Sequence, residues 1–107
     1  MKFITRQEEF ILLAVHYLRD GAYLVEIQKY LNRVTKKKWS ISSIYLPLNK
    51  MEKAGLLHTT IGEPSARRGG KAIKYYSLSQ DGYEALAKVN KVLNKMWGDN
   101  PDLVREK

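Results

Sequence analysis

The stretch Trp39–Leu57, WSISSIYLPLNKMEKAGLL, decides the fold that the sequence predicts. Ser40 can cap a helix, because its side-chain oxygen can accept a hydrogen bond from an otherwise unpaired backbone N–H. Gly55 favours the left-handed conformation that ends many helices. Between them, apolar residues recur at helical spacing, which predicts one buried face. We therefore expect a helix that leads into a strand, with an apolar face made of Ile41, Ile44, Tyr45, Leu48 and Met51.

The opposite face of this predicted helix is mostly small or polar and carries no acid. Its two lysines would be attracted by phosphates, whereas carboxylates would be repelled. Such a face can lie in the major groove of DNA, where base edges are contacted by polar and apolar side chains. The helix is thus a candidate recognition helix, and its outward face comprises Ser42, Ser43, Leu46, Asn49, Lys50 and Lys53.

Pro47 conflicts with a helix that begins directly after Ser40. Proline inside a helix removes one backbone hydrogen bond and clashes with the preceding turn. The cost is small only near the helix start, which favours a start at Ser42 or Ser43, or a local bend at the proline.

The basic charge of the chain is concentrated around this helix. The sequence has 107 residues and a net charge of +8. Residues 29–74 hold eleven Lys and Arg against two acids, a balance of +9, whereas the rest of the chain has a balance of −1. Such a basic segment indicates a polyanion as partner. The alternative is a solvated surface that only keeps the protein soluble.

Length and composition indicate a single domain that is expected in the cytoplasm. The apolar content of 44% is ordinary for a globular protein. The chain has no cysteine, which excludes disulfides and thiolate metal sites, and we expect no cofactor. No apolar run is long enough for a membrane span, and the first ten residues lack the apolar core of a signal peptide.

Helices and strands flank the candidate recognition helix on both sides. Thr5 and Glu8 have the spacing of a capping box, and Ser79 can cap the last helix. We interpret Trp39 as a core or hinge anchor. Helical periodicity predicts helices at about residues 6–18, 24–33 and 80–97, and β-branched and aromatic residues predict strands at 56–61 and 72–78.

Two groups of cations lie in the loops beside this helix. Lys36, Lys37 and Lys38 could contact phosphates across a groove edge, although a solvated charge run is an equal alternative. The hairpin tip at residues 62–71 is cationic through Arg67, Arg68 and Lys71. Arginine suits phosphates or a narrow minor groove, so we expect a DNA contact there, the alternative being a flexible solvated loop.

The last helix is more apolar on one side than a small domain needs to cover its own core. We therefore expect part of this stripe to pack against a second copy of the chain, with Asn90 fixing the register. The alternative is a helix folded back on its own core. The stripe comprises Tyr83, Leu86, Val89, Asn90, Leu93, Met96 and Trp97.

The expected fold is mainly α with a small β-hairpin, a winged helix-turn-helix followed by one further helix. Residues 1–78 would form the DNA-binding part, and residues 79–107 would form the dimerisation helix and tail of the same compact domain. The order of four sequence motifs resembles the PadR family of bacterial transcriptional regulators, in its short form with one C-terminal helix. These motifs are SIY at 43–45, EKAGL at 52–56, RGGK at 68–71 and KYYSL at 74–78, followed by Asp81-Gly82.

The resemblance implies a homodimeric regulator, usually a repressor, whose third helix enters the major groove of a pseudo-palindromic operator. It implies base or nearby phosphate contacts from Ser42, Ser43, Asn49 and Lys50, and places Tyr45 at the DNA margin or in the core. Phosphate contacts would come from Lys36, Lys37, Lys38 and Lys53, and wing contacts from Arg67, Arg68 and Lys71. Trp97 lies near the place where some members bind a flat, apolar, often cationic effector that releases DNA.

Two other function classes are alternatives to a DNA-binding regulator. A winged helix can also serve as a protein-interaction module without specific DNA binding. An enzyme is not expected, because the two histidines and the scattered acids form no nucleophile–base pair and no metal-ligand spacing.

Overall fold

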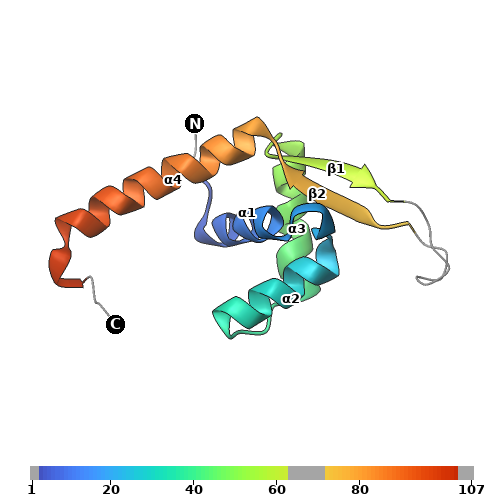
Figure 1. The fold of residues 1–107 in the computed structure, drawn as a ribbon, viewed down its shortest axis with the longest axis horizontal. Helices are drawn as coiled ribbons and strands as arrows, with labels where there is room; N and C mark the ends of the chain where they lie inside the picture. The colour runs from blue at the N-terminus through green and yellow to red at the C-terminus, as the bar shows by residue number, and fades with distance from the viewer. Residues whose placement is uncertain (1–2, 63–71, 104–107) are drawn as a thin grey trace.

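The described residues form four α-helices and one pair of antiparallel strands, in the order that the sequence predicted. The computed structural model describes residues 3–62 and 72–103. In Figure 1 the helices α1, α2 and α3 gather at the centre, while α4 and the hairpin extend to opposite sides. The elements are α1 (Arg6–Leu18), α2 (Leu24–Thr35), α3 (Ile41–Lys53), β1 (Leu57–Ile61), β2 (Lys74–Leu78) and α4 (Gln80–Asp99), with short 3-10 turns at Arg19–Gly21 and Pro101–Leu103.

The core lies where α1, α2 and α3 meet the base of the hairpin. The Thr5 capping box predicted from the sequence starts α1, since Thr5 and Glu8 exchange side-chain and backbone hydrogen bonds. Helix α1 can then place its apolar face at the centre. The fully buried side chains of the core include Ile11, Leu12, Val15, Ile27, Ile44, Leu48 and Met51.

The hairpin is antiparallel, with Leu57 opposite Leu78 and Ile61 opposite Lys74. Alternation along the strands puts Leu57, Tyr76 and Leu78 on one face, and all three are buried. A single bridge between Tyr23 and Tyr75 ties the start of α2 to the same sheet. The base of the hairpin is therefore fixed to the helical core on its inner face.

Helix α3 begins directly after Ser40, which confirms the predicted cap, and not at Ser42 or Ser43, the later start that Pro47 had suggested. The Ser40 side chain accepts a hydrogen bond from the Ser43 N–H at 3.1 Å, as a helix cap does. Pro47 lies inside the helix and leaves the Ser43 carbonyl without its usual partner. The side-chain amide of Gln7 donates to that carbonyl at 3.0 Å. A contact from α1 thus offsets part of the cost of the proline.

This compensation predicts a coupled effect on stability. Gln7→Leu should lower the free energy of unfolding by about 1 kcal/mol, the usual net contribution of one hydrogen bond. In a Pro47→Ala background the helix regains its own donor for Ser43, so the same substitution should cost less than half as much. Urea denaturation of the four variants measures the difference. Equal costs in both backgrounds would show that Gln7 does not act through Pro47.

The end of α3 confirms the role predicted for Gly55. Gly55 has φ +82°, a conformation that favours glycine. Its N–H donates to Glu52 O at 3.1 Å, and the next N–H, from Leu56, donates to Met51 O at 2.9 Å. These two bonds form a Schellman motif, which ends the helix and turns the chain into β1.

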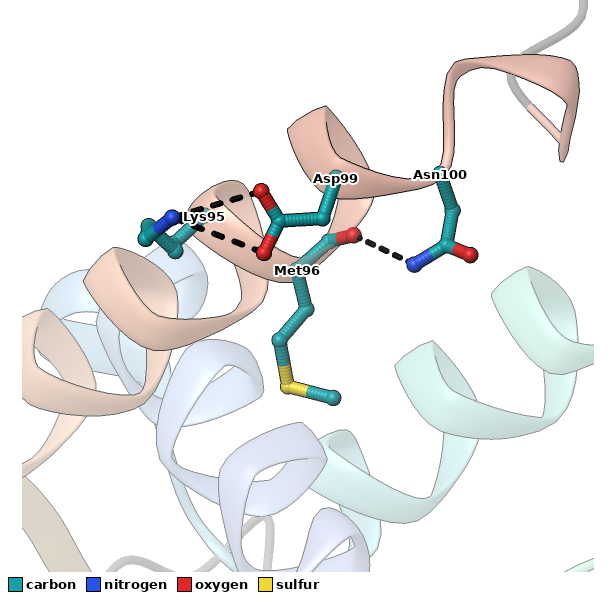
Figure 2. Close-up of polar contacts among 4 residues, drawn as sticks. All are labelled: Lys95, Met96, Asp99 and Asn100. Carbon is teal, nitrogen blue, oxygen red and sulfur yellow. Dashed lines mark hydrogen bonds and ion pairs between the residues drawn. The ribbon is translucent and has the colours of Figure 1, made fainter.

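Helix α4 starts on that turn and then leaves the body of the protein. Ser79 caps it by accepting from the Gly82 N–H, and the Ser79 hydroxyl donates to Gly55 O at 2.6 Å. The helix extends two residues beyond the predicted end, to Asp99, where the Asn100 side chain donates to Met96 O at 2.9 Å (Figure 2). Helix α2 likewise extends to Thr35 instead of Arg33. The described helices include none that is long and apolar enough to cross a membrane.

Candidate nucleic-acid interface

The outward face of α3 is the centre of the candidate site. Ser42, Leu46 and Lys53 lie on it and are exposed. Ile41 and Tyr45 are exposed as well, at 41% and 45%, so Ile41 is not buried with the rest of the apolar face and Tyr45 does not lie in the core, the second of the two places considered for it. The buried face is set by Ile44, Leu48 and Met51 alone, and the two other residues lie at the edges of that stripe.

Leu46 lies on the outward face of α3 but was not among the predicted DNA contacts. Its side chain is 63% exposed, the highest value among the large apolar residues of α3. An apolar side chain at the centre of a recognition face can contact the methyl group of thymine. The signal was present in the sequence, since Leu46 belongs to the outward face, but its apolar character made it less obvious than its polar neighbours.

Three of the predicted contact residues are less available than the periodicity suggested. The Ser43 hydroxyl donates to Ser40 O at 2.7 Å, inside the first turn of α3. Asn49 is half-buried. The Lys50 ammonium lies 3.4 Å from a carboxylate oxygen of Glu8 and so faces the start of α1. The outward face therefore centres on Ser42, Leu46 and Lys53, with Tyr45 and Asn49 beside them.

The turn between α2 and α3 holds the recognition helix in place, with Trp39 as the anchor that the sequence predicted. Trp39 packs against the core and donates from its indole N–H to Thr35 Oγ1 at 3.0 Å. Its backbone N–H donates to Asn32 Oδ1, and its carbonyl accepts from the Gln28 side chain, both at 2.7 Å. These bonds fix the angle between α2 and α3.

Lysines surround the start of α3. Lys36 ends α2 in a left-handed conformation with φ 60°, and Lys36, Lys37 and Lys38 are all exposed. Lys37 and Lys38 line a shallow hollow together with Ser40 and Ser43. The N-terminus of a helix also carries a partial positive charge. This end of α3 therefore suits a phosphate group beside the groove that α3 would enter.

A carboxylate at the other flank of α3 joins the helix to both strands. Lys74 Nζ lies 3.0 Å from Glu52 Oε1, and Thr59 Oγ1 donates to Glu52 Oε2 at 3.3 Å. The hydrogen bond from Lys74 lowers the pKa of Glu52, and the same bond raises the pKa of Lys74. Burial raises the pKa of the neighbouring Tyr76 phenol. Glu52 is therefore an anion whose charge Lys74 largely neutralises.

The wing contacts predicted at Arg67, Arg68 and Lys71 lie outside the described residues. The strands that lead to them are in place on either side, and Figure 1 shows the hairpin leaving the helical body beside α3. Within residues 3–62 and 72–103, no group of three His, Asp or Glu side chains is placed to hold a metal ion.

Solved structures of regulators share this fold along almost the whole chain. A PadR-like transcriptional regulator of Bacillus cereus matches with a TM-score of 0.73 and 25% identity, over 94% of this chain and 92% of that one. A protein of Streptococcus mutans matches with a TM-score of 0.69 and 28% identity, over the same shares. A PadR-like transcription factor of Bacteroides fragilis matches with a TM-score of 0.75 and 21% identity, over 91% and 88%. No protein-family model and no curated protein matches the sequence.

The fold and its similarity to these solved regulators place the chain in the class of winged helix-turn-helix transcriptional regulators, which bind DNA. Within that class, the resemblance to the PadR family predicted from the motifs is confirmed by the solved structures. The expectation of a regulator and not an enzyme agrees with them.

Proposed function

We propose that the protein is a sequence-specific transcriptional repressor that acts in the cytoplasm as a homodimer on a pseudo-palindromic operator. Residues 1–78 would bind DNA, and residues 79–107 would join the two copies. Helix α3 would enter the major groove, with Ser42, Tyr45, Leu46 and Asn49 near the base edges. Phosphates would be contacted by Lys36, Lys37, Lys38 and Lys53, and the wing residues Arg67, Arg68 and Lys71 would contact the adjacent backbone or minor groove.

The observation that carries this proposal is the outward face of α3. The helix has a single acid, Glu52, and that acid is paired with Lys74. Exposed lysines lie at both ends of the face, with Lys37 and Lys38 before it and Lys53 near its end. A projecting helix with this charge pattern suits a groove between two rows of phosphates.

The dimer is supported by the unpartnered half of α4. In Figure 1 its C-terminal half extends beyond α1, and the described residues measure 54 Å along the longest axis and 21 Å along the shortest. Met96 and Trp97 on this half are 56% and 50% exposed. Leu93 beside them is half-buried, whereas Leu86, nearer the helix start, packs against the chain's own core. A second copy would cover the exposed part of the stripe and set two α3 helices about 34 Å apart, the spacing of one DNA turn.

The same end of α4 supports an effector site within the dimer. Trp97 lines a hollow of about 240 Å³ together with Arg6, Leu93 and Met96. An exposed indole beside the apolar side chains of Leu93 and Met96 suits a small planar molecule, apolar or cationic, that stacks on the ring. Such a molecule at the dimer interface would change the spacing of the two recognition helices and so release the operator.

Selection from a random-sequence duplex library tests the function. We expect enrichment of an inverted repeat with half-site centres about 10 base pairs apart, because two copies would read equivalent sites one helical turn apart. Fluorescence anisotropy should give a Kd at least about a thousandfold lower for the selected duplex than for a scrambled one. Lack of any enriched sequence, with equal weak binding to all duplexes, would favour a protein-interaction module instead.

A further inference from the structure

We propose that Lys74 and Glu52 form an ion-pair brace that sets the angle of the wing against the recognition helix, so that Lys74 neutralises Glu52 and does not contact phosphate. The proposal rests on the DNA-binding function proposed above and adds two residues to it. Lys74 and Glu52 would be positioning residues, which act through the placement and charge of the groups that touch DNA.

The geometry of the carboxylate supports a brace. Both Glu52 oxygens are engaged, one by Lys74 of β2 and the other by Thr59 of β1. One side chain of α3 therefore contacts both strands of the hairpin. Glu52 follows Tyr45 by two helical turns, so it lies at the edge of the outward face that turns toward the hairpin.

The place of the pair in the hairpin explains why the angle of the wing would depend on it. Lys74 shares the inner face of the hairpin with Tyr76 and Leu78, which are buried. Its strand partner Ile61 is already 66% exposed. On this face of the hairpin the core thus ends at Tyr76. The ion pair at Lys74 is the next contact along the hairpin, away from the core. Beyond it the sequence continues to Arg67, Arg68 and Lys71.

The surroundings of Lys74 favour a pair with Glu52 over a contact with phosphate. Its ammonium lies 5.6 Å from the centre of the Tyr76 ring, within the range of a cation–π interaction. Together with the 3.0 Å pair, this holds the ammonium between the helix and the strands. The side chains of Lys74 and Glu52 are 40% and 33% exposed. DNA lying against α3 would therefore come close to Glu52 if Lys74 were removed.

A double-mutant cycle tests the brace on the duplex selected above. Lys74→Met should raise the Kd about tenfold, because it leaves the Glu52 carboxylate unpaired near phosphates. Glu52→Gln in the Lys74→Met background removes the unpaired charge and keeps an amide oxygen that can still accept from Thr59 of β1, so it should restore the Kd to within about threefold of the unmodified protein. Lys74→Arg, which keeps the pair, should change the Kd less than threefold.

The salt dependence separates the brace from a direct phosphate contact. The plot of log K against log salt has a negative slope. Removing a lysine that neutralises one phosphate makes this slope less steep by about 0.9. The brace predicts that Glu52→Gln alone steepens this slope, since Lys74 then becomes available to the DNA. The proposal would be overturned if Lys74→Met made the slope less steep by about 0.9 and Glu52→Gln did not restore the Kd.

Lys95→Met is the matched control. Lys95 pairs with Asp99 at 3.3 Å on the last turns of α4 (Figure 2), and this end of α4 lies away from α3 (Figure 1). This variant loses the same charge and an ion pair of the same kind, but far from the recognition helix. We therefore expect a smaller change in Kd than for Lys74→Met, and no restoration of the Kd by Asp99→Asn. The two proposals can be refuted separately. If the unmodified protein binds no duplex, the proposed function is refuted. If the unmodified protein binds but Glu52→Gln does not restore the Kd of Lys74→Met, the brace alone is refuted.

Discussion

Gly82→Ala should destabilise the protein by about 2–3 kcal/mol, although alanine normally stabilises a helix relative to glycine. Gly82 is buried in the first turn of α4, and a Cβ there would overlap the carbonyl oxygen of Leu56 and lie close against its carbonyl carbon. That carbonyl also accepts the Ser79 N–H at 3.1 Å, so it cannot move without disturbing the helix cap. A loss of this size corresponds to a fall in melting temperature of roughly 10–20 °C for a domain of this length.

Gly98→Ala on the same helix is the control for this prediction. A Cβ at Gly98 would meet no described atom within 4 Å. The substitution should therefore leave the protein unchanged or stabilise it by up to about 1 kcal/mol, through helix propensity alone. Thermal unfolding followed by circular dichroism measures both variants. Equal effects of the two substitutions would show that α4 does not depend on its close approach to the turn after α3.

The main elements were predictable because their signals are local. The Thr5 capping box, Ser40, Gly55 and Ser79 each act within one helical turn, and the structure places a helix end at every one of them. Local signals of this kind depend little on contacts with distant residues, so they can be read from the sequence. The fold class followed from their order along the chain.

What the sequence could not decide depends on contacts between distant residues. The start of α3 stayed open between Ser40 and Ser42 or Ser43, because the group that compensates for Pro47 is Gln7, bonded to a carbonyl 36 residues away in the sequence. Tyr45 was left open between the DNA margin and the core because periodicity gives the centre of an apolar stripe but not its width. The Glu52–Lys74 pair spans 22 residues and required the register of the hairpin.

Disruption of the proposed dimer should have a large effect on DNA affinity. Met96→Glu combined with Trp97→Glu should yield a monomer, because it places two carboxylates on the exposed part of the α4 stripe, where the second copy would have to desolvate them. Both side chains are at least half exposed, so the fold of the monomer should be retained. Affinity for the selected duplex should fall by about a hundredfold or more, since each recognition helix would then bind alone. Sedimentation velocity and fluorescence anisotropy measure the two effects.

Lys91→Glu supplies the control, because it changes the net charge by the same two units from an exposed position off the apolar stripe of α4. The loss of long-range attraction to DNA should be similar in the two proteins, whereas only the Met96 and Trp97 variant should lose its second copy. The salt slope distinguishes them further: a monomer contacts about half as many phosphates, so its slope should be about half that of the dimer. A Met96 and Trp97 variant that still sediments as a dimer and binds as Lys91→Glu does would place the interface between copies somewhere other than the end of α4.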